Sequence, residues 1–207
     1  VMHVLLINGS PHEKGCTYTA LSLVAGELNA AGITTEILNV GTKPVGGCIG
    51  CGGCAKGNGC VFGGVVNEAI EKARTADAFV FGTPVHYASA SGNMTSFLDR
   101  LAYAGGKYLA YKPAAICASA RRAGTTATLD QLAKYPEFFH MPLVSGSYWP
   151  MVHGSNPEQV LQDEEGCAVM KELGRNMAWL LQCIEAGKAA GISHPENPRR
   201  PMTNFIR

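Results

Sequence analysis

Five short apolar runs, separated by segments of helical periodicity, are the strongest constraint on how this chain of 207 residues can fold. Each run is six or seven residues long, is bounded by Gly, Pro, Asn or other turn-forming residues, and consists largely of apolar residues. The runs span residues 2–7, 34–40, 77–82, 113–119 and 142–148. A continuous apolar run of this length is typical of a strand that is buried on both faces, as in a parallel sheet.

Helical patterns lie between these runs. The segment 17–32 places Leu21, Val24 and Leu28 at helical spacing and ends on Gly32, a residue type favoured at helix C-termini. Similar patterns span residues 65–76, 93–105, 126–136 and 164–187. Five strands that alternate with five helices predict a doubly wound α/β sheet. No linker or internal repeat divides the chain, so we expect one domain over residues 1–207.

The composition excludes several classes of partner. Apolar residues make up 46% of the chain, charged residues 16%, and the net charge is +1 without a basic run, which argues against a nucleic-acid partner. No segment approaches the roughly 20 apolar residues of a membrane span. The opening VMHVLLI lacks the basic start and cleavage site of a signal peptide. We therefore expect a cytoplasmic protein that acts on small molecules and keeps its thiols reduced.

The loop after the first predicted strand, NGSPHEKGCTYTA, is the first candidate site. In such sheets ligands bind at the carboxyl ends of the strands. A loop there that leads into a helix offers free backbone N–H groups and the positive end of the helix dipole to an anion. Ser10 and Thr17 add hydroxyl groups, and Gly9 and Gly15 allow close approach of the backbone. The loop is neither a Walker loop nor G-x-G-x-x-G, so it indicates either a phosphate monoester such as FMN or simple capping by Ser10 and Thr17.

Two further loops should lie at the same edge of the sheet. In TPVHYASASG, Pro84 stiffens the turn, and His86 and Tyr87 supply flat rings that could line a planar group such as an isoalloxazine. In CASARRAG, Ser119 and Arg121 follow a buried strand, and an arginine there could meet a flavin carbonyl or a nicotinamide phosphate. The alternative is that these are exposed loop residues without a ligand.

The stretch CIGCGGCAKGNGC, residues 48–60, holds four of the eight cysteines. Its C-x2-C-x2-C-x5-C spacing is too compact for a structural zinc site, which pairs two C-x2-C knuckles across a dozen or more residues. Three cysteines at steps of three, with a fourth just beyond, are typical of a [4Fe–4S] cluster. A reversible disulfide and free thiols are the alternatives. We expect Cys117, Cys167 and Cys183 to act as small buried hydrophobic residues.

Four segments together resemble the flavodoxin-like NAD(P)H-dependent FMN reductase family: NGSPHEKGCTYTAL, GTPVHYASASGNMTSFLDR, ASARRAGTTATL and the ending TNFIR. The cysteine-rich loop at 44–62 is similar to that of the iron–sulfur flavoproteins, a branch of this family. The resemblance covers nearly the whole chain. It implies a flavodoxin-like sheet of five parallel strands in the order 2-1-3-4-5 with helices on both faces, a C-terminal tail at 188–207, and a homodimer or homotetramer.

The resemblance also implies which residues bind cofactors. Those expected around FMN are Ser10, His12, Gly15, Cys16, Thr17, Pro84, Val85, His86, Tyr87, Ser119 and Arg121, and those expected around a [4Fe–4S] cluster are Cys48, Cys51, Cys54 and Cys60. The chain departs from the family at two places. The first loop of the family often has the pattern G-S-P-R-K-x-G-N-T, whereas His12, Glu13 and Cys16 stand here and provide less positive charge. The iron–sulfur branch often has an Asp-Asp pair after the fourth cysteine, where this chain has Gly63 and Gly64.

Three functions are compatible with these observations. In the first, FMN accepts a hydride from NAD(P)H and passes electrons to a flavin, quinone, nitro or azo compound, and no general acid or base is assigned. In the second, the protein is an electron carrier in which FMN and a [4Fe–4S] cluster exchange electrons with a ferredoxin-like protein donor. In the third, the protein is a non-catalytic flavin-binding sensor whose cysteines form a disulfide switch.

Overall fold

A computed structural model describes residues 1–198 and 200–204 of the chain, so Phe205–Arg207 of the ending TNFIR lie outside it. The parallel strands are β1 (His3–Asn8), β2 (Thr34–Asn39), β3 (Ala78–His86), β5 (Ala114–Ala120) and β6 (Met151–His153). They lie in the order β2-β1-β3-β5-β6, and the short strand β4 (Ser89–Ala90) pairs antiparallel with β3. The order of the five parallel strands is the predicted 2-1-3-4-5, which confirms the flavodoxin-like fold.

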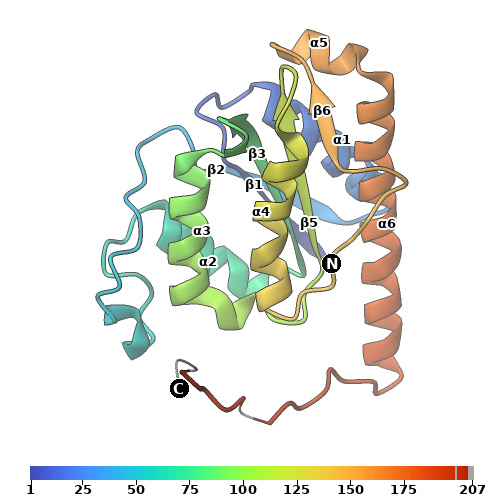
Figure 1. Ribbon diagram of the computed structural model, residues 1–207. Coiled ribbons are helices and arrows are strands. Elements are labelled where there is room, and N and C mark those ends of the chain that lie inside the picture. The colour runs from blue at the N-terminus through green and yellow to red at the C-terminus, as the bar shows by residue number, and fades with distance from the viewer. Residues whose placement is uncertain (199, 205–207) are drawn as a thin grey trace.

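Helices cover both faces of the sheet (Figure 1). One face is covered by α1 (Cys16–Ala30), α5 (Pro157–Gln162) and α6 (Glu164–Ala189). The other face is covered by α2 (Val65–Thr75), α3 (Gly92–Gly105) and α4 (Thr125–Phe138). Two short 3-10 helices, η1 (Gly53–Lys56) and η2 (Gly106–Tyr108), lie in the connections. No helix in the described part of the chain combines the length and the apolar content that a membrane span requires.

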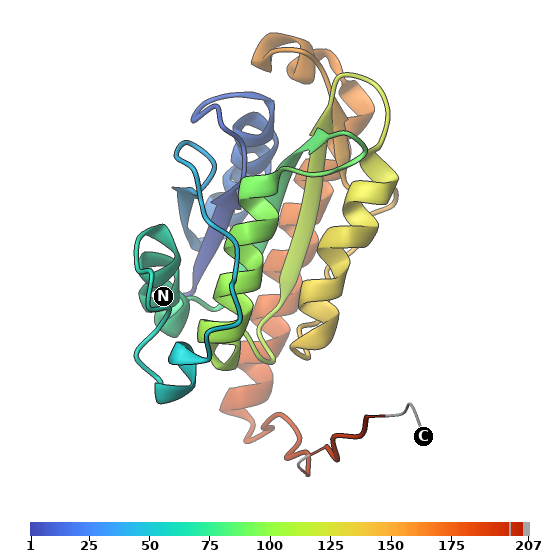
Figure 2. The same ribbon diagram turned by 60° about the vertical axis from the view of Figure 1, so that its left-hand side comes forward.

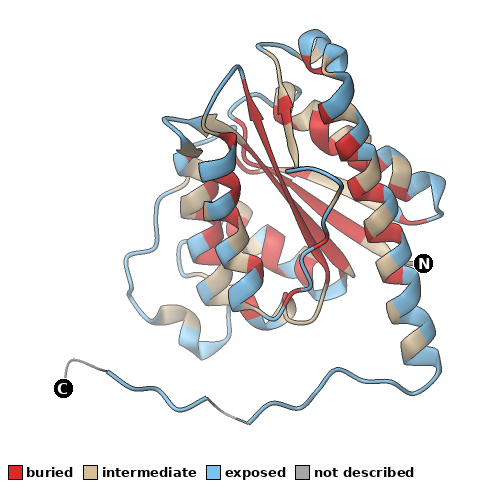
Figure 3. Cartoon of the chain, turned by 45° about the vertical axis from the view of Figure 1, so that its right-hand side comes forward, coloured by how far each residue is buried: buried red, intermediate tan, exposed pale blue. Residues whose placement is uncertain are grey.

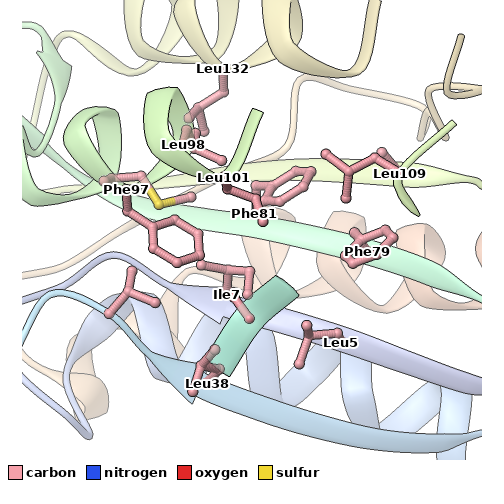
Figure 4. Packing of buried hydrophobic residues seen from close by; sticks show 14 of the residues in the cluster. Leu5, Ile7, Leu38, Phe79, Phe81, Phe97, Leu98, Leu101, Leu109 and Leu132 are labelled. Atoms are coloured by element: carbon pink, nitrogen blue, oxygen red, sulfur yellow. The ribbon is translucent and has the colours of Figure 1, made fainter. Parts of the chain in front are cut away.

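The central strands are buried on both sides, which explains their continuous apolar sequences (Figure 3). Successive side chains of a strand point to opposite faces of the sheet. Leu5 and Ile7 therefore pack with Phe79 and Phe81 beneath α2, α3 and α4, as Figure 4 shows. Val4 and Leu6 pack on the opposite face, against α1 and α6.

The fifth strand differs from the prediction. Residues 142–148 are not a strand: only an isolated bridge joins Leu143 to Ala114, and the strand β6 begins at Met151. Hydrogen bonds to α6 draw this segment away from the sheet, since Ser147 donates to Glu172 from its amide (2.8 Å) and hydroxyl (2.6 Å). Asn176 also donates to the Ser145 carbonyl. The prediction failed because these partners lie on a helix more than twenty residues away.

The third strand is longer than predicted. Pro84, Val85 and His86 were expected in a loop, but they extend β3, and Pro84 lies opposite Ser119 of β5. The neighbouring strand β1 ends at Asn8, opposite Gly82, so the missing N–H of Pro84 interrupts no hydrogen bond to β1. The structure thus tolerates a proline in a central strand because that strand extends beyond its neighbour.

We predict opposite effects for two Gly→Ala substitutions. A Cβ atom at Gly41 would lie closer than van der Waals contact to the carbonyl oxygens of Gly9 and Ser10, which are backbone atoms that cannot rotate away. Gly41→Ala should therefore lower the free energy of unfolding by about 1–3 kcal/mol. Gly26 is exposed within α1 and has no neighbour near its Cβ position. Gly26→Ala should therefore raise the free energy of unfolding by about 0.5–1 kcal/mol. Chemical denaturation measures both, and destabilisation by Gly26→Ala would contradict the helix assignment.

Candidate functional site

The loops that follow β1, β3 and β5 meet at one edge of the sheet, at the top of the view in Figure 1. This arrangement follows from the parallel strands, whose carboxyl ends all point to the same edge. A close contact between two of the loops supports it, because a Cβ atom at Gly124 would collide with Ala88. The structure therefore brings together the three loops predicted to form a site.

Asn8 at the end of β1 shapes the first loop. Its side chain is fully buried, accepts a hydrogen bond from the Ser10 amide (3.1 Å), and donates to the Glu13 carbonyl (3.2 Å) and to Asn39 (2.8 Å). The hydroxyl of Ser10 in turn accepts a hydrogen bond from the His12 amide. Asn8 was not among the predicted site residues, although a polar residue that ends a buried apolar strand is a usable signal.

The helix that follows this loop begins without a side-chain cap. Gly15 is the N-cap of α1, no side chain accepts a hydrogen bond from the first-turn amides, and the first turn contains no acidic residue. Helices α2 and α4 likewise begin on glycines without a side-chain cap, whereas α3, α5 and α6 are capped by Ser91, Asn156 and Asp163. An uncapped helix start carries unsatisfied N–H groups and partial positive charge, which suit an anion such as a phosphate.

Two predicted residues from different loops are directly bonded. The hydroxyl groups of Thr17 in α1 and Ser119 in β5 lie 2.8 Å apart, and both side chains are buried. The alternative that Thr17 only caps the helix is not supported, since Gly15 holds the capping position and lacks a side-chain bond. The pair connects the start of α1 to the end of β5 beneath the site.

A tight hairpin forms the second side of the site. Residues Tyr87 and Ala88 adopt positive φ angles of 51° and 57°, and β3 turns through them into β4. Gln131 of α4 fixes the hairpin, because its side-chain oxygen accepts hydrogen bonds from the Ser89 hydroxyl (2.7 Å) and the Ala90 amide (2.9 Å). Positive φ is unfavourable for residues other than glycine and marks positions held by their surroundings.

Four of the remaining predicted residues have exposed side chains. His12, His86, Tyr87 and Arg121 are exposed, and the Tyr87 ring is completely so. Cys16 instead lies toward β6, where its thiol is 3.5 Å from the Gly154 carbonyl oxygen. Burial is the main cause that raises the pKa of the Cys16 thiol above its ordinary value. The exposed rings are thus available to a ligand at this edge, whereas the Cys16 thiol stays protonated and bonded to the backbone.

The cysteine-rich loop forms a second candidate site away from this edge. It descends along α3, as Figure 2 shows, to η1 and then returns to the start of α2. A cavity of about 270 Å³ lies against α3 and is lined by all four cysteines of the stretch, together with apolar residues and Arg100. Cys48 and Cys51 are exposed, whereas Cys54 and Cys60 are partly buried. We call this space the cysteine pocket.

The shape of the cysteine pocket suits a group of several atoms better than a single ion. In the described part of the chain, no three His, Cys, Asp or Glu side chains converge as the ligands of one metal ion do. All four cysteines of the stretch line the cavity of about 270 Å³, which has room for more than a single ion. An iron–sulfur cluster held by four thiolates fits this arrangement. All eight cysteines, which lie in the described residues, are free, so no disulfide is formed.

Arg100 of α3 borders the cysteine pocket and was not predicted to do so. Its side chain is 7% exposed, and its Nε atom lies 3.3 Å from the Cys60 sulfur. Its terminal nitrogens donate to the carbonyl groups of Gly46 (3.3 Å) and Gly63 (3.0 Å). Forty residues separate Arg100 from Cys60, so no local pattern in the sequence indicates the pair.

The other cysteines follow the expectation only in part. Cys117 in β5 is fully buried, and burial raises the pKa of its thiol to about 12. Cys167 is partly buried and donates to the Val160 carbonyl. Cys183 is exposed on α6, so the prediction that it is a buried residue is wrong. Its helix packs on the sheet through the neighbouring Leu181 instead.

A family model described as NADPH-dependent FMN reductase matches residues 2–156. An iron–sulfur flavoprotein of Methanocaldococcus jannaschii is 26% identical over 193 residues, which cover 89% of this chain and 100% of that protein. An iron–sulfur flavoprotein of Archaeoglobus fulgidus is 29% identical over 175 residues, which cover 83% of this chain and 86% of that protein.

Solved structures show the same fold. An NAD(P)H:quinone oxidoreductase from Methanothermobacter marburgensis superposes with a TM-score of 0.65 at 18% identity, covering 85% of this chain and 96% of that one. An NADH:FMN oxidoreductase superposes with a TM-score of 0.62 at 20% identity, covering 88% and 90%. At these identities the likeness concerns the arrangement of strands and helices, not the chemistry of the loops.

Proposed function

We propose that this chain, which belongs to the NADPH-dependent FMN reductase family, passes electrons from NAD(P)H through FMN to a small acceptor such as a flavin, a quinone, or a nitro or azo compound. Membership of the family makes it an FMN-dependent oxidoreductase. When bound, FMN supplies the redox chemistry, and the protein supplies binding, orientation and electrostatics. The observation that carries the proposal is the uncapped start of α1 at the edge where three loops meet.

The first loop and α1 would hold the phosphate of FMN. The first-turn amides of α1 have no side-chain partner, and Asn8 holds the loop in the conformation that leads to them. Ser10 and Thr17 are buried at its base, where Ser10 supports the His12 amide and Thr17 contacts Ser119. The helix N-terminus therefore supplies the positive potential that the loop lacks in the absence of an arginine at position 12.

The hairpin after β3 and the end of β5 would flank the flavin ring. Pro84 and Ser119 lie side by side on neighbouring strands, and the hairpin that follows Pro84 is fixed by Gln131. His86 and Tyr87 are exposed on the hairpin. A rigid hairpin with exposed rings would orient a planar cofactor and leave room for NAD(P)H or an acceptor beside it.

The central test is the anaerobic reduction of the bound flavin. We expect the FMN-loaded protein to lose its flavin absorbance rapidly when NADPH or NADH is added, and to regain it when a quinone or free flavin is supplied. Stopped-flow absorbance measures both steps, and the faster nucleotide identifies the donor. A flavin that stays oxidised with both nucleotides would exclude direct NAD(P)H oxidation and leave a role as an electron carrier or sensor.

A charge at Gly15 tests the phosphate site. A carboxylate at the N-cap would accept hydrogen bonds from the same amides and repel a phosphate, so Gly15→Asp should weaken FMN binding at least tenfold. Gly15→Ala is the matched control, because both side chains place a Cβ against His12 and only one carries a charge. Fluorescence titration of FMN gives both affinities. Equal affinities of the two variants would place the phosphate elsewhere.

A second candidate function is electron transfer that also uses a [4Fe–4S] cluster, with a ferredoxin-like protein as donor. The cysteine pocket supports it, since four cysteines line one cavity beside a buried cation. Cys48, Cys51, Cys54 and Cys60 would be the ligands. The similarity to two iron–sulfur flavoproteins, over 89% and 83% of this chain, supports the same proposal. The sensor hypothesis stays a prediction, because free thiols are one of the two states of a reversible disulfide switch.

We predict that protein purified without oxygen contains about four iron and four sulfide per chain, as a [4Fe–4S] cluster requires. Cys51→Ser should remove most of this iron and the broad visible absorbance of the cluster, while FMN content stays unchanged. Cys183→Ser is the control, since Cys183 is an exposed thiol on α6 that does not line the cysteine pocket. Iron and sulfide analysis decides the question, and wild-type protein without iron would contradict the cluster.

A further inference from the structure

We infer that Arg100 is a positioning residue that supplies the counter-charge for the cysteine pocket and thereby favours the reduced state of a cluster held there. The inference rests on the cluster proposed above. It concerns a residue of α3 that lies outside the cysteine-rich segment and belongs to the opposite wall of the pocket.

The contacts of Arg100 place its charge beside a thiol. Its side chain is 7% exposed, and the Nε atom lies 3.3 Å from the Cys60 sulfur. The guanidinium also lies over the Phe62 ring, with its central carbon 5.7 Å from the ring centre. Apolar cover of this kind reduces the screening of the charge by water, so the guanidinium acts strongly on groups in the pocket.

No carboxylate neutralises this cation among the described residues. None of the ion pairs in the described part of the chain includes Arg100. The adjacent Asp99 accepts a hydrogen bond from Tyr135 on α4 instead, at 2.6 Å. The whole segment 41–64 contains Lys43 and Lys56 but no Asp or Glu. A buried charge without a partner is costly, so the negative partner of Arg100 must come from the pocket itself: cysteine thiolates and the cluster they hold.

The planar shape of the guanidinium lets Arg100 do this while it holds the loop. Its two terminal nitrogens bond the carbonyl groups of Gly46 and Gly63, which lie just outside the two ends of the cysteine stretch. The third nitrogen, Nε, is thereby directed at Cys60. A lysine keeps the charge but cannot make three bonds in one plane. Comparison of Lys and Met at this position therefore separates the effect of the positive charge from the effect of the hydrogen bonds that hold the loop.

The redox step itself is simple to balance. One electron enters the cluster, its negative charge rises by one, no bond to a cysteine is formed or broken, and the guanidinium keeps all its protons. In the experiment the electron comes from dithionite through dye mediators. A nearby fixed cation stabilises the more negative state, so its removal should shift the one-electron equilibrium toward the oxidised cluster by tenfold or more. A tenfold shift corresponds to 59 mV for one electron.

The experiment compares Arg100→Met, Arg100→Lys and Arg175→Met with the wild-type holoprotein. Arg175 lies on α6, on the far face of the sheet, where it pairs with Glu27, so Arg175→Met removes the same charge at a distance from the cysteine pocket. Iron and sulfide content, thermal unfolding and FMN content are measured first. Reductive titration followed by electron paramagnetic resonance then gives the midpoint potential of the cluster in each protein.

We expect the potential to fall by at least 59 mV, a tenfold change, in Arg100→Met and to stay close to wild type in Arg100→Lys and Arg175→Met. If Arg100→Met holds no cluster, its potential cannot be measured. In that case, retention of iron by Arg100→Lys supports the inference that the positive charge at this position is required. An unchanged potential in Arg100→Met overturns the inference, as does loss of iron from both Arg100 variants with unfolding and FMN content unaffected. Wild-type protein without iron would instead contradict the proposed cluster, and the inference with it.

Discussion

The parallel pairing of β1, β3 and β5 is the constraint on which the rest of the structure depends. Because these strands run in one direction with their carboxyl ends at one edge, the loops that follow them, and the starts of α1 and α4, must meet there. The burial of both faces fixes the register, since a shift by one residue would exchange Leu5 and Ile7 with Val4 and Leu6. The candidate FMN site is thus a consequence of how the apolar core packs.

The elements whose structure is decided by their hydrophobic pattern could be predicted from the sequence. The strands β1, β2, β3 and β5 and the five long helices agree with the predicted segments within a few residues, apart from the extension of β3. The segment 142–148 also looks like a strand, but its polar groups bond to Glu172 and Asn176 of α6. The short hairpin at Tyr87 and Ala88 was missed because its turn contains neither Gly nor Asn, the residue types that favour positive φ. Tertiary contacts, which no local pattern reveals, determine the structure of the segment 142–148 and of this hairpin.

The residues of the candidate sites also divide into those that the sequence indicates and those that only tertiary contacts reveal. Residues such as Ser10, Thr17 and Ser119 could be proposed because each comes at or after the end of a buried strand, and the structure brings Thr17 and Ser119 together. The residues that hold the loops in place, such as Gln131, bond across more than forty positions of the sequence and gave no signal. Arg100 is the extreme case, because an arginine late in a helix is ordinarily a solvated surface residue. Only its burial beside Cys60 distinguishes it.

Helix α3 joins the two candidate sites and fixes the distance between them. At its start, Ser91 caps the helix and donates to the Gly9 carbonyl of the first loop at 2.7 Å. Nine residues after Ser91, Arg100 bonds both flanks of the cysteine stretch, which places the two anchor points about 14 Å apart along the axis. Between them, Phe97 and Leu98 are buried in the core. The separation between a flavin and a cluster in one chain would therefore be set by the rise of a packed helix, not by the conformation of a glycine-rich loop.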